Sequence, residues 1–400
     1  MKKILLFSVV AAMTFTACDN VASLTNKGVM ALDEGKYTEA VEFFNKAIEK
    51  DPTTASEATR MLGIIYSDSV AGIKNDKTAF EYFTKAAEIG DSIAMYKAAY
   101  AYDNGIGTLQ NQDNAMKYYT MAADAGYPQA QAVAGWIYLR GYKGVTKDEK
   151  KGAEYAKAAS EAGNADGMAY LGYAYEQGIG GVEKNESKAA ELYSQAAEAG
   201  SPDGKALLGN AYAYGNLGLV PNVTKAEELI KSSVADGSSL GMRYMGHLYA
   251  NDKISPDGKT PNQVNAISWY RKAAEAGNVD AMQNLAYNIS DYYHWDEQKQ
   301  AEAVEWYQRA ANLGNTTAMT NLGWMYEFGK GVPKSATKSF EWYTKAAENG
   351  NDVGQCNLAT FYEYGTGTQK NRAKAIEWYK KSAEQGYERA QKALKRLGVK

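Results

Sequence analysis

The residues with the greatest capacity for chemistry in this sequence are two histidines and two cysteines. A catalytic Cys–His pair or a tetrahedral zinc site needs such side chains to meet within a few ångströms. His247 and His294 stand 47 residues apart, and the cysteines, Cys18 and Cys356, lie far from both in the sequence. The spacing therefore predicts no catalytic residue, no metal site and no cofactor.

Glycine-rich stretches are the second feature that could bind a ligand. They recur along the chain, for example at residues 104–107, 177–182 and 329–333. Such loops can hold a phosphate on backbone N–H groups, but that chemistry needs a Gly-Lys-Ser/Thr sequence between a strand and a helix. No such context accompanies these stretches, so we interpret them as turns in which glycine adopts a positive φ.

The N-terminus has the pattern of an export signal. Two lysines precede an apolar run over residues 4–13, which is too short to cross a bilayer as a stable helix. The segment Phe15–Cys18 resembles the lipobox of bacterial lipoproteins, with Phe15 in place of the usual leucine. We expect residues 1–17 to be a signal peptide and residues 18–23 a lipidated linker. A signal peptide with a coincidental cysteine is the alternative.

Acylation of Cys18 would export the chain and anchor it to the inner or outer membrane of a bacterium, facing the periplasm or the surface. More than one acyl chain anchors a protein stably in a membrane, because each CH₂ group buried in the bilayer contributes about 0.8 kcal/mol. Cys356 is then left without a partner for a disulfide. The formal net charge of −3 argues against nucleic acid as a partner.

The chain repeats itself. A block of small residues, often followed by an acidic one, ends in glycine at intervals of 36 to 40 residues, from Gly90 to Gly386. A second block keeps the same register, with a leucine, a small residue and a tyrosine three positions later, as in Leu171-Gly172 with Tyr175. This regularity indicates an array of repeated structural units.

Each unit predicts two antiparallel helices. The small residue of the first helix allows the second helix to approach closely, while an alanine and an aromatic pair at i, i+3 and i+4 cover one face of the second helix. Two such helices cannot bury their apolar faces alone, so neighbouring units must stack into one continuous core.

The unit resembles the Sel-one-like repeat, a relative of the tetratricopeptide repeat. The resemblance implies an all-α fold, a right-handed superhelical solenoid of antiparallel helix pairs. We assign residues 24–56 to a tetratricopeptide-like unit, 57–386 to the Sel-one-like array and 387–400 to a C-terminal capping helix. Members of this family are as a rule adaptors, which implies a protein or peptide partner. A cysteine-rich branch has been linked to β-lactam binding, but this chain lacks its cysteines.

The residue after the small residue of each first helix is the best candidate for contact with a partner, and we call it the groove position. In tetratricopeptide proteins the equivalent position contacts peptides, and the resemblance implies the same role here. The candidates are Tyr100, Trp136, Tyr173, Asn210, His247, Tyr287 and Trp324. Alternatively, these side chains fill gaps between units.

Two further groups of residues bear on the partner. One turn beyond the groove position lie acidic residues that would give the groove an acidic edge suited to an extended, basic peptide; they are Asp103, Glu176, Glu327 and Glu363. One turn is replaced by aromatic residues, Tyr292, Tyr293 and Trp295, which are secondary contact candidates. Packing onto the next unit is the alternative for these three.

Two functions follow from this pattern. The first is a non-enzymatic scaffold, anchored to a bacterial envelope membrane through an N-terminal lipid, that binds a protein or peptide. The alternative is an envelope enzyme or binder that acts on cell-wall peptides or β-lactams.

Overall fold

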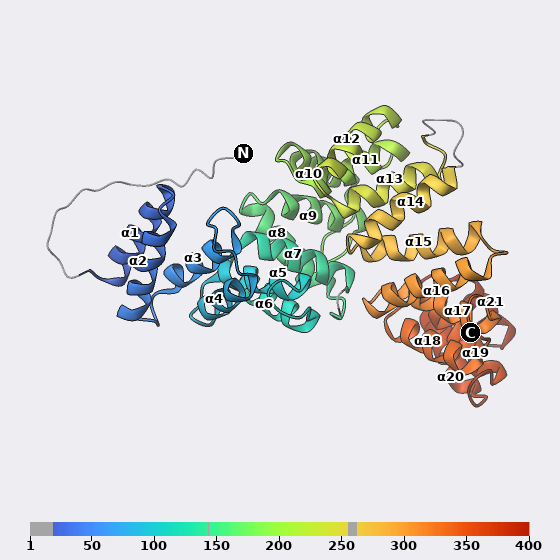
Figure 1. The fold of residues 1–400 in the computed structure, drawn as a ribbon. Coiled ribbons are helices and arrows are strands. Elements are labelled where there is room, and N and C mark those ends of the chain that lie inside the picture. The colour runs from blue at the N-terminus through green and yellow to red at the C-terminus, as the bar shows by residue number, and fades with distance from the viewer. Residues whose placement is uncertain (1–18, 143, 255–261, 400) are drawn as a thin grey trace. The chain divides into compact units, whose positions relative to one another are not determined.

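The computed structural model describes residues 19–142, 144–254 and 262–399. Across these residues the chain forms 21 α-helices and no β-strand, and consecutive helices pair as antiparallel hairpins (Figure 1). The predicted all-α solenoid is therefore confirmed. The predicted signal peptide and Cys18 lie outside the described residues.

The chain divides into two compact units between Asn111 and Gln112. The first unit contains α1 (Val21–Asp33), α2 (Tyr37–Lys50), α3 (Ser56–Ser67), α4 (Asp76–Glu88) and α5 (Ser92–Asn104). In this unit Phe44 and Leu62 are fully buried, and the face of α1 that contains Leu24 packs around them.

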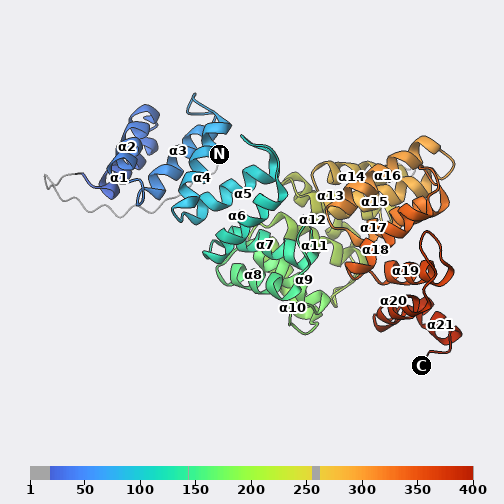
Figure 2. The same cartoon turned by 90° about the horizontal axis from the view of Figure 1, so that it is seen from below.

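The second unit is a longer series of the same hairpins (Figure 2). Its helices are α6 (Gln112–Asp124), α7 (Pro128–Arg140), α8 (Glu149–Glu161), α9 (Ala165–Gln177), α10 (Glu186–Glu198), α11 (Pro202–Tyr214), α12 (Val223–Ala235), α13 (Ser239–Ala250), α14 (Asn262–Glu275), α15 (Val279–Tyr292), α16 (Glu297–Asn312), α17 (Thr316–Phe328), α18 (Ala336–Glu348), α19 (Asp352–Tyr364), α20 (Arg372–Glu384) and α21 (Glu388–Arg396). No helix of the described residues is long and apolar enough to cross a membrane.

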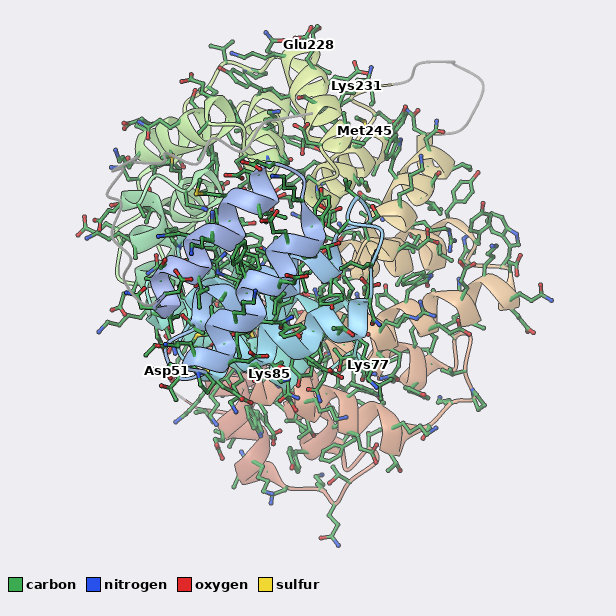
Figure 3. All side chains as sticks on the ribbon, turned by 60° about the vertical axis from the view of Figure 1, so that its left-hand side comes forward. Asp51, Lys77, Lys85, Glu228, Lys231 and Met245 are labelled. Carbon is green, nitrogen blue, oxygen red and sulfur yellow. The ribbon has the colours of Figure 1, made fainter. Side chains whose placement is uncertain are left out.

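The first helices of successive hairpins form an inner layer in the second unit. Helix α7 packs against α9, α9 against α11 and α11 against α13, whereas no second helices in the described part of the chain pair comparably with one another. Charged side chains such as Glu228 and Lys231 are exposed on α12, one of these second helices, while Met245 of α13 is buried (Figure 3). Closer packing of the first helices makes their layer the concave one.

Short polar residues and glycines set the helix ends. At the start of α9 the Asn164 side chain accepts a hydrogen bond from the backbone N–H of Gly167, and Gly178 ends the helix with φ +66°. Two residues later Gly180, with φ +73°, lies so close to α8 that a Cβ would be 2.5 Å from the carbonyl oxygen of Glu149. The glycine-rich stretches therefore form turns with positive-φ glycines, as predicted, and they also pack closely on neighbouring helices.

In most hairpins whose first helix has a glycine as the small residue, that glycine lies directly under a side chain of the second helix. A Cβ on Gly172 would meet the Tyr193 ring at 2.8 Å, and one on Gly246 would meet the Tyr270 ring at 2.6 Å. These distances are shorter than van der Waals contact, so only a residue without a large side chain allows this approach. The close approach expected at this position is confirmed.

The last helix closes the core of the second unit. In α21 Ala390 and Ala393 are buried, and Leu394 and Leu397 pack beside them. Lys392 and Lys395 carry charge on the same short helix, which is the composition expected of a terminal cap.

We expect Gly172→Leu to lower the free energy of unfolding by about 1–3 kcal/mol, because the added methylenes must displace the Tyr193 ring or the helix backbone. Gly209 faces Ile230 in the same way, so Gly209→Leu should lower the free energy of unfolding by a similar amount. Urea denaturation followed by circular dichroism measures both. The control is Gln195→Leu on the exposed face of α10, with a change within about 0.5 kcal/mol. Glycine variants as stable as wild type would contradict the packing described.

Candidate functional site

The groove-position residues of the second unit fall into two groups. Tyr287 and Trp324 are exposed, with 54% and 44% of their surface accessible to solvent. The others are half-buried; they are Trp136, Tyr173, Asn210 and His247. Tyr100, on α5 of the first unit, is exposed.

Trp136 and Tyr173 are occupied by contacts within the chain. The Trp136 ring stacks on Tyr170 at 4.7 Å between centroids and meets Tyr173 edge to face at 5.1 Å. The guanidinium of Arg140 lies 5.4 Å from the centre of each ring of the pair. This pair therefore fills the gap between α7 and α9 around an arginine of the chain itself.

The same arginine belongs to a polar cluster that joins distant repeats. Arg140 donates to the hydroxyls of Tyr173 and Tyr142 and to the carboxylate of Asp280, each at 2.7 Å. Asp280, 140 residues away at the start of α15, also accepts hydrogen bonds from Tyr142 and, at 3.2 Å, from Arg243. One carboxylate thus links α7, α13 and α15.

The charges of this cluster support each other. Burial on its own would raise the pKa of Asp280, but Arg140 and Arg243 hold it below its ordinary value. Burial and the neighbouring Asp280 raise the pKa of Tyr142, so its hydroxyl stays protonated and donates. At neutral pH Asp280 is therefore a carboxylate held between two guanidinium groups.

A polar cavity of about 370 Å³ lies beside this cluster. Its lining includes Arg140, Lys147 and the turns that precede α17 and α19. At its edge the backbones touch, because a Cβ on Gly314 would be 2.5 Å from the carbonyl oxygen of Gly141. The cavity therefore lies where the turn after α7 meets the turn before α17.

His247 is a packing residue. Its Nε2 lies 2.9 Å from the amide nitrogen of Asn284, and its ring meets Tyr244 and Tyr270 edge to face. Burial, aided by the positive charge of Arg243, lowers the pKa of His247 from 6.5 to about 3. The imidazole is thus neutral at pH 7. The described residues contain no group of three or more His, Cys, Asp or Glu side chains that could hold a metal.

Tyr287 and Trp324, in contrast, line an open pocket of about 470 Å³. Helix α15 contributes Tyr287, Ser290 and Asp291, and His294 follows the end of that helix. Tyr307 of α16 and three residues of α17, namely Asn321, Trp324 and Met325, complete it. We call this the α15/α17 pocket.

Asp291 is the one acidic residue that lines the α15/α17 pocket, and its carboxylate has no ion pair among the described residues. Burial is the main cause of a raised pKa at Tyr307, and the charges of Tyr287 and Asp291 add to it. The carboxylate therefore acts electrostatically on the pocket. Sequence reasoning missed Asp291, although it follows Tyr287 by four residues and so shares its helix face.

The secondary contact candidates form one aromatic cluster. The rings of Tyr292 and Tyr293 meet at 4.7 Å, and Trp295 lies 6.4 Å from each. Tyr292 and Tyr293 pack against the core of the second unit, while Trp295 is 68% exposed. His294 contacts Trp295 and lines the α15/α17 pocket, so the cluster adjoins that pocket.

The prediction that four acidic residues form an edge of the groove is wrong for three of them. Buried tyrosine hydroxyls of the second helices donate to Glu176, Glu327 and Glu363 at 2.6–2.9 Å. Glu363 also pairs with Arg396. These carboxylates hold the two helices of a hairpin together, because the residue one turn beyond the groove position turns toward the second helix.

Comparison with known protein families matches the Sel1 repeat nine times. The matched segments are residues 56–91, 92–127, 128–164, 165–201, 202–238, 239–278, 279–315, 316–351 and 353–387. The chain belongs to the Sel1 repeat family. A tetratricopeptide repeat matches residues 21–54, ahead of the Sel1 array. The predicted family is confirmed.

Solved structures similar to this Sel1 array come from several bacteria. A protective antigen of uropathogenic Escherichia coli with an SLR fold is 26% identical, with 94% of this chain and 88% of that chain covered and a TM-score of 0.45. A Sel1 repeat protein of Oxalobacter formigenes is 25% identical, with 63% of this chain and 96% of that chain covered and a TM-score of 0.44. An immunity protein of Pseudomonas aeruginosa is 20% identical, with 55% of this chain and 81% of that chain covered and a TM-score of 0.42. No curated protein matches the sequence.

We expect Asp280→Asn to destabilise the Sel1 array by about 3–5 kcal/mol, because it leaves Arg140 and Arg243 buried without their counter-charge. Urea denaturation measures the loss, and hydrogen exchange should rise in the turns around Gly141 and Gly314. The control is Asp236→Asn, which breaks the more exposed pair with Lys205 and should cost at most about 1 kcal/mol. Equal losses in the two variants would argue against a linking role for Asp280.

Proposed function

We propose that the chain is a non-enzymatic scaffold that binds a protein or peptide on the inner layer of its Sel1 array, at the α15/α17 pocket. The observation that supports this most is the exposure of Tyr287 and Trp324 in consecutive repeats on either side of one pocket. Repeats of this kind present extended concave surfaces to their partners.

The contrast between the two aromatic pairs strengthens the proposal. Trp136 and Tyr173 already contact Arg140, so little of their aromatic surface is left for a partner. Tyr287 and Trp324 leave about half of their surface in water, although burial of aromatic surface is favourable. Large exposed aromatics beside a pocket are the side chains that most often supply binding energy. The adjoining Trp295 extends the surface beyond the pocket.

We further propose that the scaffold is exported and fixed to a bacterial envelope membrane by acylation of Cys18. The support is the sequence itself, where a basic start and a short apolar run precede a lipobox-like segment. A lipid anchor would hold the repeats at a membrane surface without a spanning helix.

We expect Tyr287→Ala and Trp324→Ala each to weaken retention of the partner by about 2 kcal/mol or more, with a melting temperature close to wild type. Retention is measured by capture from an envelope extract and quantified against the wild-type chain. Trp136→Ala and Tyr173→Ala should instead lower the melting temperature, since they remove packing around Arg140.

The control for these variants is Leu109→Ala, an apolar residue that is 87% exposed in the first unit and should change neither measurement. Unchanged retention in a folded Tyr287→Ala/Trp324→Ala double variant would move the binding surface away from this pocket, first to Tyr292, Tyr293 and Trp295.

We expect Cys18→Ser to release the protein from membranes, because the acyl chains would be the strong hydrophobic anchor of the processed chain. Membrane fractionation measures the release, and mass spectrometry of the N-terminal peptide detects the lipid. Cys356→Ser is the matched control, since that cysteine is buried and should leave the partitioning unchanged. Membrane association of Cys18→Ser equal to wild type, without a lipid adduct on the wild-type residue, would refute the anchor.

A further inference from the structure

The two aromatic pairs of the inner layer occupy equivalent places in the repeat. Trp136 and Tyr173 are 37 residues apart, and so are Tyr287 and Trp324, and all four stand at the groove position. In each pair one aromatic residue therefore projects from the same point of two consecutive first helices. What differs is the charged side chain that accompanies each pair.

The first pair contacts a guanidinium along one side, and its two rings also meet each other edge to face. Arg140 stands four residues after Trp136, and its Cζ lies 5.4 Å from the centres of both Trp136 and Tyr173. A carboxylate, Asp280, completes this arrangement from a distant repeat at 2.7 Å. Two aromatic walls and one carboxylate are therefore a combination that this solenoid itself uses to hold an arginine.

The second pair has the same two residue types at the same repeat positions and a carboxylate in its pocket, but no cation. The residue four positions after Tyr287 is Asp291 in place of arginine, so the charge at this point of the repeat is reversed. No lysine or arginine lines the α15/α17 pocket, and Asp291 has no ion pair among the described residues. The volume of the pocket, about 470 Å³, is ample for one side chain.

We propose that the α15/α17 pocket receives an arginine side chain of the partner, with the guanidinium against the rings of Tyr287 and Trp324 and its charge facing Asp291. This inference rests on the proposed function and states the chemistry of the partner. Ser290 and Asn321 add polar atoms to the lining, and a planar guanidinium with five N–H donors uses such groups better than a lysine ammonium.

The test uses the full chain labelled with 5-fluorotryptophan, in which the Trp324 resonance is assigned by its absence from Trp324→Phe. The probes are the peptides acetyl-Gly-Arg-Gly-amide and its citrulline counterpart, which has nearly the same shape without the charge. We expect the arginine peptide to shift the Trp324 resonance with a dissociation constant about tenfold lower than that of the citrulline peptide.

Asp291→Asn should reduce this ratio to about 3 or less, with an unchanged melting temperature because the residue is exposed. The control is Glu297→Gln, which removes an exposed carboxylate at the start of α16 and should leave the tenfold ratio of dissociation constants unchanged. Equal affinity of wild type for the two peptides, a ratio that survives Asp291→Asn, or no shift of Trp324 with either peptide would overturn the inference. A lysine peptide that binds as tightly as the arginine peptide would overturn the choice of guanidinium.

These outcomes are separate from those of the proposed function. If Tyr287→Ala and Trp324→Ala lose the envelope partner while the two peptides bind equally, the binding surface stands and the arginine assignment falls. If the peptides discriminate as expected but the double variant retains the partner, the pocket binds arginine and the assignment of the partner's binding surface to this pocket falls.

Discussion

The close approach of the two helices in each hairpin is the constraint on which the rest of the structure depends. Where the first helix has a glycine at this position, with the exception of Gly135, a tyrosine, phenylalanine or isoleucine of the second helix lies so near that a Cβ would collide with it. This contact fixes the rotation of the first helix about its axis. The next residue along, about 100° around the helix, must then turn away from the second helix and toward the inner layer. The groove position is a consequence of that packing.

The same rotation explains why the acidic residues one turn further do not edge the groove. The hydroxyl of Tyr193 or Tyr343, whose ring covers the glycine, ends beside the glutamate of the first helix and donates to it. One side chain therefore supplies both the apolar contact and the polar contact of the hairpin. Burial raises the pKa of Glu176, which is the cost of placing a carboxylate there and is offset in part by the tyrosine hydrogen bond.

A second constraint acts over a much longer distance. The Asp280 carboxylate joins α7 to α13 and α15, and Gly141 touches Gly314, so hairpins four repeats apart contact each other within the second unit. A solenoid bound only by neighbouring contacts would be free to bend along its length. Here a buried ion cluster restrains that freedom around the inner layer, where rigid placement of Tyr287 and Trp324 would lower the entropy that this chain gives up when it binds a partner.

The amino-acid sequence by itself determined the helical pairs, their register, the small-residue contact and the groove position, because each depends on side chains within one repeat or its neighbour. Local periodicity carries that information. Only the tertiary structure decided which groove positions are open. Nothing near Arg140 in the sequence points to Asp280, since the contact between these two residues results from small rotations summed over four repeats. The same holds for the α15/α17 pocket, whose lining comes from three helices and from the turn that contains His294.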